Sequence, residues 1–256
     1  MKISFYKYHG TGNDFIMIDN RALQCLDIST DQVKSMCDRR FGIGADGLIL
    51  LRNKDGYDFE MVYYNADGNQ SSMCGNGGRC IVAFAKYLGV IESTCNFLAI
   101  DGPHEARVSE DYVVELKMSD VSSVEKDGQD YVLNTGSPHY VKSVSDLDDF
   151  NVYEEGKSIR CSKKYSGEGI NVNFVVEYGS YLEVATYERG VEDETYSCGT
   201  GVVACALSLG RSEDQPINIV TKGGKLSVSY KTQDEGFTDI WLKGPAVKVF
   251  EGTVEV

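Results

Sequence analysis

Two cysteines of this chain share the same short context. Cys74 begins a Cys-Gly-x-Gly pattern within "SMCGNGGRC" (72–80), and Cys198 begins it again within "SCGTG" (197–201). Both patterns lie just before a small-residue, apolar run of helix length. A thiol at a helix start is close to free backbone N–H groups and to the positive end of the helix dipole, which lower the pKa of a thiol. Cys74 and Cys198 are therefore candidates for chemistry that needs a thiolate.

The glycines of the two patterns add an anion site to these thiols. The backbone can approach a ligand closely and present N–H groups at Gly75, Gly77, Gly199 and Gly201. Two facing helix starts would bind a carboxylate, and offsetting its charge makes the proton on the neighbouring carbon easier to remove. One thiolate could take that proton while the opposite thiol gives a proton to the other face. The patterns thus indicate inversion of a stereocentre without a cofactor.

Other chemistries fit the two patterns less well, although a single copy would most often be a helix-capping turn. A phosphate-binding loop would end in Gly-Lys-Ser/Thr, which neither copy has. A Cys–His hydrolase would use one cysteine and leave the second copy unexplained. The eight cysteines include no Cys-x-x-Cys pair and the three histidines stand far apart, so no metal site is expected. Most of the cysteines are expected to be buried small side chains, and a disulfide between the two thiols would be an inactivated form.

The two patterns belong to a longer internal repeat. Cys198 lies 124 residues after Cys74, and the same offset places Thr11-Gly12 on Thr135-Gly136 and Asn65 on Arg189. The offset holds from residue 11 to about residue 80, and "LAIDGPHEARV" (98–108) then resembles "NIVTKGGKLSV" (218–228). Such a repeat indicates two similar domains. We expect α+β halves packed with pseudo-symmetry around one cleft, with the boundary in the polar region 117–130.

Hydrophobic patterning indicates the elements of both halves. Helices are expected near 30–39, capped by Ser29 or Thr30, and at 76–88 and 200–209, with Gly89 and Gly210 suited to the C-caps. Strands are expected at 2–8, 14–18, 46–52, 57–64, 112–118, 172–178, 181–187, 218–230 and 238–242.

Composition excludes several classes of function. The chain has 256 residues, of which 42% are hydrophobic, and a formal net charge of −14. Without a basic block this charge argues against a nucleic-acid partner, and no apolar run is long enough for a membrane span. The alternating start "MKISFYKYHG" is typical of a first strand and not of a signal peptide. We expect a cytoplasmic protein with a small-molecule partner.

Five ordered motifs match a known family. They are "GTGNDFIMID" (10–19), "NADGNQSSMCGNGGRC" (65–80), "GSPHYV" (136–141), "GINVNF" (169–174) and "ERGVEDETYSCGTG" (188–201). Together they resemble diaminopimelate epimerase over nearly the whole chain. The resemblance implies a PLP-independent, two-base epimerase that interconverts LL- and meso-diaminopimelate on the route to lysine and peptidoglycan, with no cofactor. The implied fold has two halves, each a mostly antiparallel sheet around a central helix, at 1–118 (completed by a strand at 247–256) and 119–246.

The resemblance also implies the roles of the catalytic residues. Cys74 and Cys198 correspond to the two acid/base thiols. His139 and Glu188 correspond to groups near the thiols that help to set their protonation. The helix starts Gly75-Asn76 and Gly199-Thr200 correspond to the groups that hold the carboxylate and amine of the reacting centre.

Further residues match the family's substrate contacts. Arg189 suits the distal carboxylate of diaminopimelate, because a guanidinium binds a carboxylate in a bidentate manner, and Glu188 can meet an ammonium group. Arg189 is the repeat partner of Asn65, so the symmetry is broken where a distal group would be recognised. The matching positions are Asn13, Asn65, Asn171, Glu188 and Arg189, and Asn76 and Ser137 are further candidate contacts.

Two departures from the family pattern affect the choice of substrate. Ser137 stands where many members have Asn, and Gly47 stands where some have a Gln that contacts substrate. The alternative function is therefore a cofactor-independent racemase or epimerase of the same fold with another amino acid as substrate. A hypothesis of a different class is a two-domain binding protein that closes around an amino acid, which would not need a thiol at each helix start. Family members often form dimers, so a homodimer is a further expectation.

Overall fold

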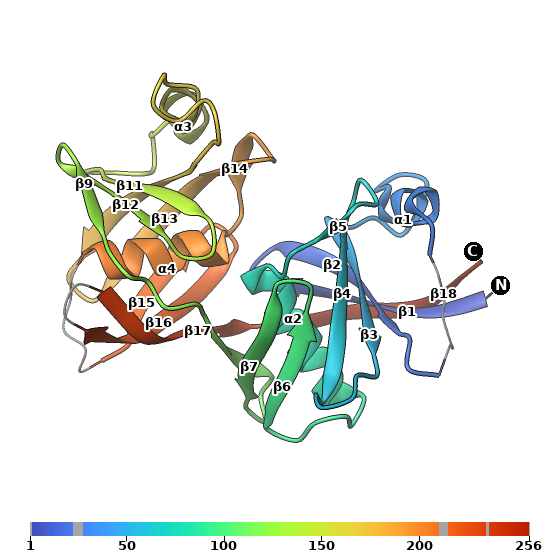
Figure 1. Cartoon of the computed structure of the whole chain (residues 1–256). Coiled ribbons are helices and arrows are strands. Elements are labelled where there is room, and N and C mark those ends of the chain that lie inside the picture. Colours follow the sequence, from blue (N-terminus) through green and yellow to red (C-terminus); the bar gives the residue numbers. More distant parts are fainter. Residues whose placement is uncertain (1, 23–27, 210–214, 234–235, 256) are drawn as a thin grey trace. The chain divides into compact units, whose positions relative to one another are not determined.

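The computed structural model describes residues 2–22, 28–209, 215–233 and 236–255. The chain divides into two compact units (Figure 1). The first unit runs to Leu116 and takes up the chain again from Gly244, and the second unit runs from Lys117 to Lys243. The last strand of the chain is therefore part of the first unit, where it pairs with the first strand.

The first unit is a mixed, mostly antiparallel sheet with two helices. The parallel pairs among its described strands are β2 with β3 and β4 with β6, and the other pairs are antiparallel. Its elements are β1 (Lys2–Gly10), β2 (Asn13–Asp19), α1 (Thr30–Cys37), β3 (Gly47–Arg52), β4 (Phe59–Asn65), β5 (Gln70–Ser71), α2 (Gly75–Tyr87), β6 (Thr94–Ala99), β7 (Gly102–Val108), β8 (Val113–Lys117) and β18 (Val247–Glu255).

The second unit repeats this order of elements and pair directions. The pairs β11 with β12 and β13 with β15 are parallel, at the same places in the order as the parallel pairs of the first unit. Its elements are β9 (Glu125–Asp127), β10 (Asp130–Asn134), β11 (Pro138–Ser143), α3 (Val152–Arg160), β12 (Asn171–Tyr178), β13 (Tyr181–Glu188), β14 (Asp193–Thr195), α4 (Gly199–Ser208), β15 (Ile217–Thr221), β16 (Gly224–Gln233) and β17 (Gly236–Pro245). The duplication found in the sequence is therefore also a duplication of structure.

Each unit has a helix enclosed by strands. Every residue of α2 from Gly75 to Ala85 is buried, and α2 contacts β1, β2, β3 and β7. In the second unit α4 contacts β10, β11, β12, β13 and β16. Helices that are apolar and small on all sides pack in this way because no face needs water. The expected arrangement of a sheet around a central helix is confirmed for both units.

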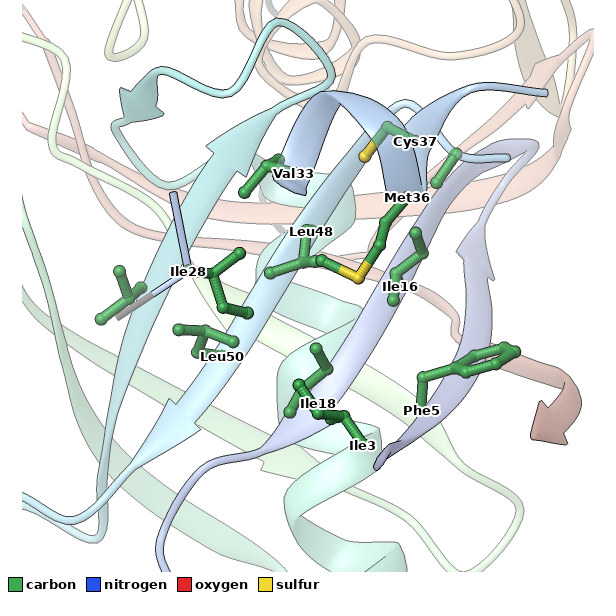
Figure 2. Packing of buried hydrophobic residues seen from close by; sticks show 12 residues of the cluster. Ile3, Phe5, Ile16, Ile18, Ile28, Val33, Met36, Cys37, Leu48 and Leu50 are labelled. Atoms are coloured by element: carbon green, nitrogen blue, oxygen red, sulfur yellow. The ribbon is translucent and has the colours of Figure 1, made fainter. Parts of the chain in front are cut away.

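The outer face of the first sheet carries a second apolar cluster beneath α1. Figure 2 shows Leu48 and Leu50 of β3 beside Val33 and Met36 of α1. Ile49, between the two leucines, points to the opposite face, where its Cδ1 approaches Gly77 of α2. This alternation of successive side chains lets one strand serve both helices.

The helix starts agree with the sequence, whereas several segments differ from it, among them the strands β6, β10 and β11, which the hydrophobic pattern does not predict. Ser29 caps α1 in a capping box with Gln32, and Gly89 follows α2 with a φ of +69°. The strand expected at 218–230 is wrong as one element, because Lys222 and Gly223 form a turn between β15 and β16. Helix α3 was not expected at all. Gly210, the other suggested C-cap, lies outside the described residues.

Candidate functional site

Cys74 is the N-cap residue of α2. Its Sγ accepts a hydrogen bond from the backbone N–H of Gly77 at 3.2 Å, and the residue is half-buried. A hydrogen bond from an N–H group to sulfur stabilises the thiolate more than the thiol. The local fold therefore gives Cys74 the environment that the sequence pattern suggested.

The second glycine of each pattern is needed because a side chain there would meet neighbouring atoms of the protein. A Cβ at Gly77 would lie 3.2 Å from Sγ of Cys74, and a Cβ at Gly201 would lie 2.3 Å from Oδ1 of Asn173. The sequence assigned these two glycines to close approach of a ligand. The structure gives a different reason, because the missing side chains would meet Cys74 and Asn173.

Asn76 and Asn13 are joined in an ordered row of hydrogen bonds beside Cys74. The guanidinium of Arg79 donates to Oδ1 of Asn76 at 3.0 Å. Nδ2 of Asn76 donates to Oδ1 of Asn13 at 3.3 Å, and Nδ2 of Asn13 donates to Oδ2 of Asp46 at 2.6 Å. Arginine only donates and a carboxylate only accepts, so the two ends of the row fix the orientation of both amides.

Asn65 lies at the end of β4, directly opposite Gly47 on β3. Its backbone N–H donates to the carbonyl of Asn69, which closes the loop leading to β5. A Cβ at Gly47 would lie 2.6 Å from the ring of Tyr63 and 2.6 Å from the carbonyl oxygen of Tyr64. In this chain position 47 therefore has no room for a side chain, and a glutamine there would displace Tyr63.

In the second unit four predicted site residues lie together at the start of α4. Oγ1 of Thr200 lies 3.5 Å from Sγ of Cys198, 3.3 Å from Oγ of Ser137 and 2.9 Å from Nε2 of His139. Cys198 is the N-cap residue of α4 and is 8% exposed. The two patterns thus place a cysteine at the same point of each unit, but only Cys198 has an imidazole one hydroxyl away.

The hydrogen bonds of Asn173 fix His139 in one neutral tautomer. Nδ2 of Asn173 contacts Nδ1 of His139 at 3.1 Å and donates to the carbonyl of Tyr140 at 2.9 Å, while Oδ1 of Asn173 accepts from Thr186. Since the carbonyl can only accept, the amide nitrogen must face both groups, and Nδ1 must be an acceptor. The proton of His139 is therefore on Nε2, where it is donated to the hydroxyl of Thr200 or Ser137.

The surroundings of His139 also oppose its protonation. The side chain is completely buried, and burial together with the positive charge of Arg189 lowers the pKa of His139 to about 3 from its usual 6.5. At neutral pH the imidazole is uncharged. His139 acts on its neighbours as a hydrogen-bond donor and not as a cation.

Asn171 is hydrogen-bonded to two of the other predicted contacts, Ser137 and Arg189. Its Nδ2 donates to Oγ of Ser137 at 3.2 Å and to the carbonyl of Pro138 at 3.1 Å. Its Oδ1 accepts from the backbone N–H of Arg189 at 2.9 Å. The amide of Asn171 therefore positions Ser137 and the start of the Arg189 loop.

Glu188 is the last residue of β13, and Arg189 follows it directly. Arg189 is exposed, and its guanidinium donates to the carbonyl of Glu168 at 3.2 Å. Glu188 is half-buried and accepts a hydrogen bond from the hydroxyl of Thr195 at 3.0 Å. An exposed guanidinium held by one carbonyl keeps donors for a ligand carboxylate.

Within the described ranges, no group of three or more His, Cys, Asp or Glu side chains is placed to hold a metal ion. Among the same residues, none of the helices is both long and apolar enough to cross a membrane.

Sequence reasoning missed three buried polar residues that support these sites: Arg79, Asn173 and Thr186. The sequence carries a signal for two of them. Arg79 interrupts the apolar run of α2, and Asn173 occupies an inward position between Val172 and Phe174, which are also buried. A charged or amide side chain in an otherwise apolar element must find partners, because burying it alone is costly.

The chain is similar to known proteins over nearly its whole length. The chain matches the family model described as diaminopimelate epimerase over residues 5–124 and 131–249. A protein named diaminopimelate epimerase from Flavobacterium psychrophilum is 51% identical over 256 residues, covering 98% of this chain and 100% of that protein. One of the same name from Chlorobaculum tepidum is 42% identical and covers 96% of this chain and 98% of its own length.

Solved structures share the fold at low sequence identity. A phenazine biosynthesis protein of the PhzF family from Bacillus anthracis has a TM-score of 0.76 and 12% identity, with full coverage of both chains. A hydroxyproline epimerase from Agrobacterium vitis, with bound trans-4-hydroxy-L-proline, has a TM-score of 0.71 and 13% identity over 99% of this chain and 92% of its own.

Proposed function

Because the chain belongs to the diaminopimelate epimerase family, we propose that it interconverts LL- and meso-diaminopimelate without PLP. The reaction inverts one α-carbon of a free amino acid and serves the supply of lysine and peptidoglycan precursors. We place this reaction in the cytoplasm. The relatives' names and the full-length match to them support the substrate.

One observation carries the mechanism: in both units a cysteine is the N-cap residue of the enclosed helix. Epimerisation requires one group to remove the α-proton from one face and another group to supply a proton to the opposite face. We assign these two tasks to Cys74 and Cys198. In one direction a thiolate takes the proton and the other thiol gives one, and the reverse direction exchanges the roles.

The carbanion formed between the two steps needs stabilisation at the α-carboxylate. Backbone N–H groups at the starts of α2 and α4 are donors of the required kind, and Asn76 and Thr200 add polar side chains beside them. Donors that are already fixed in place need little reorganisation when the negative charge develops. The row of hydrogen bonds through Asn76 and Asn13 provides this fixation in the first unit.

The distal end of diaminopimelate is a second amino acid group. Arg189 is proposed to bind the distal carboxylate and Glu188 the distal ammonium, with Asn65 and Asn171 as further contacts. The charges support this assignment, because a cation and an anion adjacent in sequence suit a zwitterion. The hydrogen bonds of Asn171 to Ser137 and to the backbone N–H of Arg189 support a positioning role for this amide.

His139 is proposed to assist Cys198 through Thr200. Its Nε2–H donates to the hydroxyl cluster, so the hydroxyl hydrogen of Thr200 is free to point to the sulfur or to substrate. A hydrogen bond donated to Sγ stabilises the thiolate after it has given up its proton. The neutral imidazole therefore works as a positioning group for the hydroxyl that contacts Cys198.

The substrate is tested by exchange of the α-proton in D₂O. The protein is incubated with LL-diaminopimelate and, separately, with lysine, histidine, glutamate and trans-4-hydroxy-L-proline, and deuterium is followed by mass spectrometry. We expect exchange and inversion with diaminopimelate alone. Exchange with one of the simple amino acids but not with diaminopimelate would replace this proposal with the alternative, an epimerase of the same fold for another amino acid.

A further inference from the structure

Arg79 is a cation in an unusual place, fully enclosed near the start of a helix. It has 0% exposure and is the fifth residue of α2. Side chains on a helix lean toward the N-terminus, and its guanidinium folds back to the carbonyl of Gly75 at 3.1 Å. A positive charge at this end of a helix is repelled by the helix dipole. A nearby negative charge is therefore expected to offset the charge of Arg79.

The guanidinium is only partly satisfied by neutral partners. It donates to Gly75, to Oγ1 of Thr11 at 3.1 Å and to Oδ1 of Asn76 at 3.0 Å. Its Nε is buried and has no hydrogen-bond partner among the described residues. Nor is an ion pair of Arg79 with any described carboxylate found. A buried cation without a carboxylate is costly unless another anion offsets it.

The titratable groups around Arg79 leave one candidate for that anion. Cys80 of α2 and Tyr8 of β1 are buried, and burial raises the pKa of both groups well above neutrality. Asp14 of β2 is ionised, but its carboxylate is bound by Lys7 at 2.6 Å and by Arg39 at 2.7 Å. The remaining group is Cys74, which is half-buried and directly precedes Gly75, whose carbonyl accepts a hydrogen bond from Arg79.

The second unit has no counterpart of this cation. The repeat offset of 124 residues places Val203 at the position of Arg79. Behind Cys198 lie instead the neutral His139 and Asn173, at the positions of Phe15 and Ile49. The helix and its cysteine are duplicated, whereas the charge behind the cysteine is not.

We propose that Arg79 is the resident counter-charge of the Cys74 thiolate and the residue that positions Asn76 beside it. This makes Cys74 the thiol that is ionised before substrate binds, while Cys198 starts as the protonated partner. Arg79 is a positioning residue, because it acts through Cys74 and Asn76 and not by contact with substrate. The inference rests on the proposed role of Cys74 in proton transfer, but its test reads the thiol itself.

The test is the pH dependence of alkylation at individual cysteines. The whole protein is treated with iodoacetamide at pH values from 5 to 10, and the rate is measured by mass spectrometry on the peptides that contain Cys74 and Cys161. Cys161 is exposed and serves as the internal reference. In the wild-type protein we expect the midpoint for Cys74 to lie below the midpoint for Cys161.

Two uncharged variants, Arg79→Met and Arg79→Gln, separate charge from shape. The glutamine keeps a donor toward Asn76 without the charge. Both are expected to raise the midpoint for Cys74 by about one pH unit or more, since an opposite charge nearby typically shifts a pKa by this amount. Arg79→Lys, which keeps the charge, is expected to stay closer to wild type. The matched control is Lys86→Met, which removes a cation from the last turn of the same helix.

The outcomes decide the inference independently of epimerase activity. A Cys74 midpoint that does not move in a folded Arg79→Met or Arg79→Gln variant would overturn it. If neither variant folds, a wild-type midpoint for Cys74 at or above that of Cys161 would overturn it, and a lower one supports it. A protein that shows the expected shifts but does not act on diaminopimelate would refute the proposed function and leave the role of Arg79 intact.

Discussion

Nε2 of the buried His139 lies 2.9 Å from the hydroxyl oxygen of Thr200. Because Asn173 donates to the other ring nitrogen, the imidazole can only donate at Nε2. The hydroxyls of Thr200 and Ser137, each 2.9 Å from Nε2, can therefore only accept from His139, and the hydrogen of Thr200 is directed elsewhere, with Sγ of Cys198 at 3.5 Å. Asn173, two positions after Asn171, thus determines which way a hydroxyl at the helix start points.

Asn173→Asp tests this orientation. An aspartate accepts a hydrogen bond where the asparagine donates one, so Nδ1 of His139 would carry a proton and the pKa of His139 would rise. We expect kcat for epimerisation to fall by roughly 10²-fold, the usual cost of losing one oriented donor, with a changed pH–rate profile. Asn134→Asp is the control, because Asn134 is exposed and its side chain already accepts. Equal kcat values for the two variants would contradict the orientation by Asn173.

The depressed pKa of His139 predicts a pH dependence of stability. The pKa is about 3 in the folded protein against 6.5 for a free imidazole. Between these values the unfolded chain binds more protons, so the free energy of unfolding falls as the pH is lowered through this window, by up to about 1.4 kcal/mol per pH unit. His139→Gln should show a shallower fall in urea titrations from pH 7 to pH 4. Parallel curves for the two proteins would show that His139 is not buried as a neutral group.

Gly201→Ala tests the packing between α4 and Asn173. The added methyl group would lie 2.3 Å from Oδ1 of Asn173, so either the helix or the amide must move. We expect a loss of about 1–3 kcal/mol in the free energy of unfolding, as for other overpacked sites, and a lower kcat. Gly179→Ala is the matched control, since a Cβ at Gly179 meets nothing within 4 Å. Similar stabilities of the two variants would rule out the packing role of Gly201.

Arg189→Lys tests the recognition of the distal carboxylate. A lysine keeps the positive charge but offers one compact group instead of a planar fork. We expect KM for LL-diaminopimelate to rise roughly 10-fold or more, in line with the loss of a charged hydrogen bond, with a smaller change in kcat. The measurement is steady-state kinetics beside Lys163→Arg, an exposed control. A KM that stays at the wild-type value would remove Arg189 from the substrate contacts.

The parts of the fold that follow local rules could be predicted from the sequence. The capping box at Ser29, the cysteine N-caps and the two enclosed helices depend on neighbouring residues and on hydrophobic pattern. Helix α3 could not be predicted in this way, because Gly156 in its middle lowers helix propensity. The glycine is required by the tertiary structure, since a Cβ there would lie 2.3 Å from Cβ of Tyr187.

The residues of the site also divide into those that the sequence predicts and those that it does not. The repeat singled out Cys74 and Cys198, because equivalent positions stand out when a sequence is compared with itself. It did not reveal Arg79, Asn173 or Asp46, whose importance comes from contacts with residues that are distant in sequence. The asymmetry between the two units consists largely of such residues, so a comparison based on symmetry overlooks it.

The most direct test of the central claim is the rate of epimerisation of LL-diaminopimelate by Cys74→Ala and Cys198→Ala, measured beside Cys80→Ala. Cys80 is buried six residues after Cys74 and has Ala204 at the equivalent position of the repeat. We predict that the first two variants fold but lose epimerisation, while Cys80→Ala keeps it. Epimerisation by a folded Cys74→Ala or Cys198→Ala variant at the rate of Cys80→Ala would contradict the two-thiol mechanism.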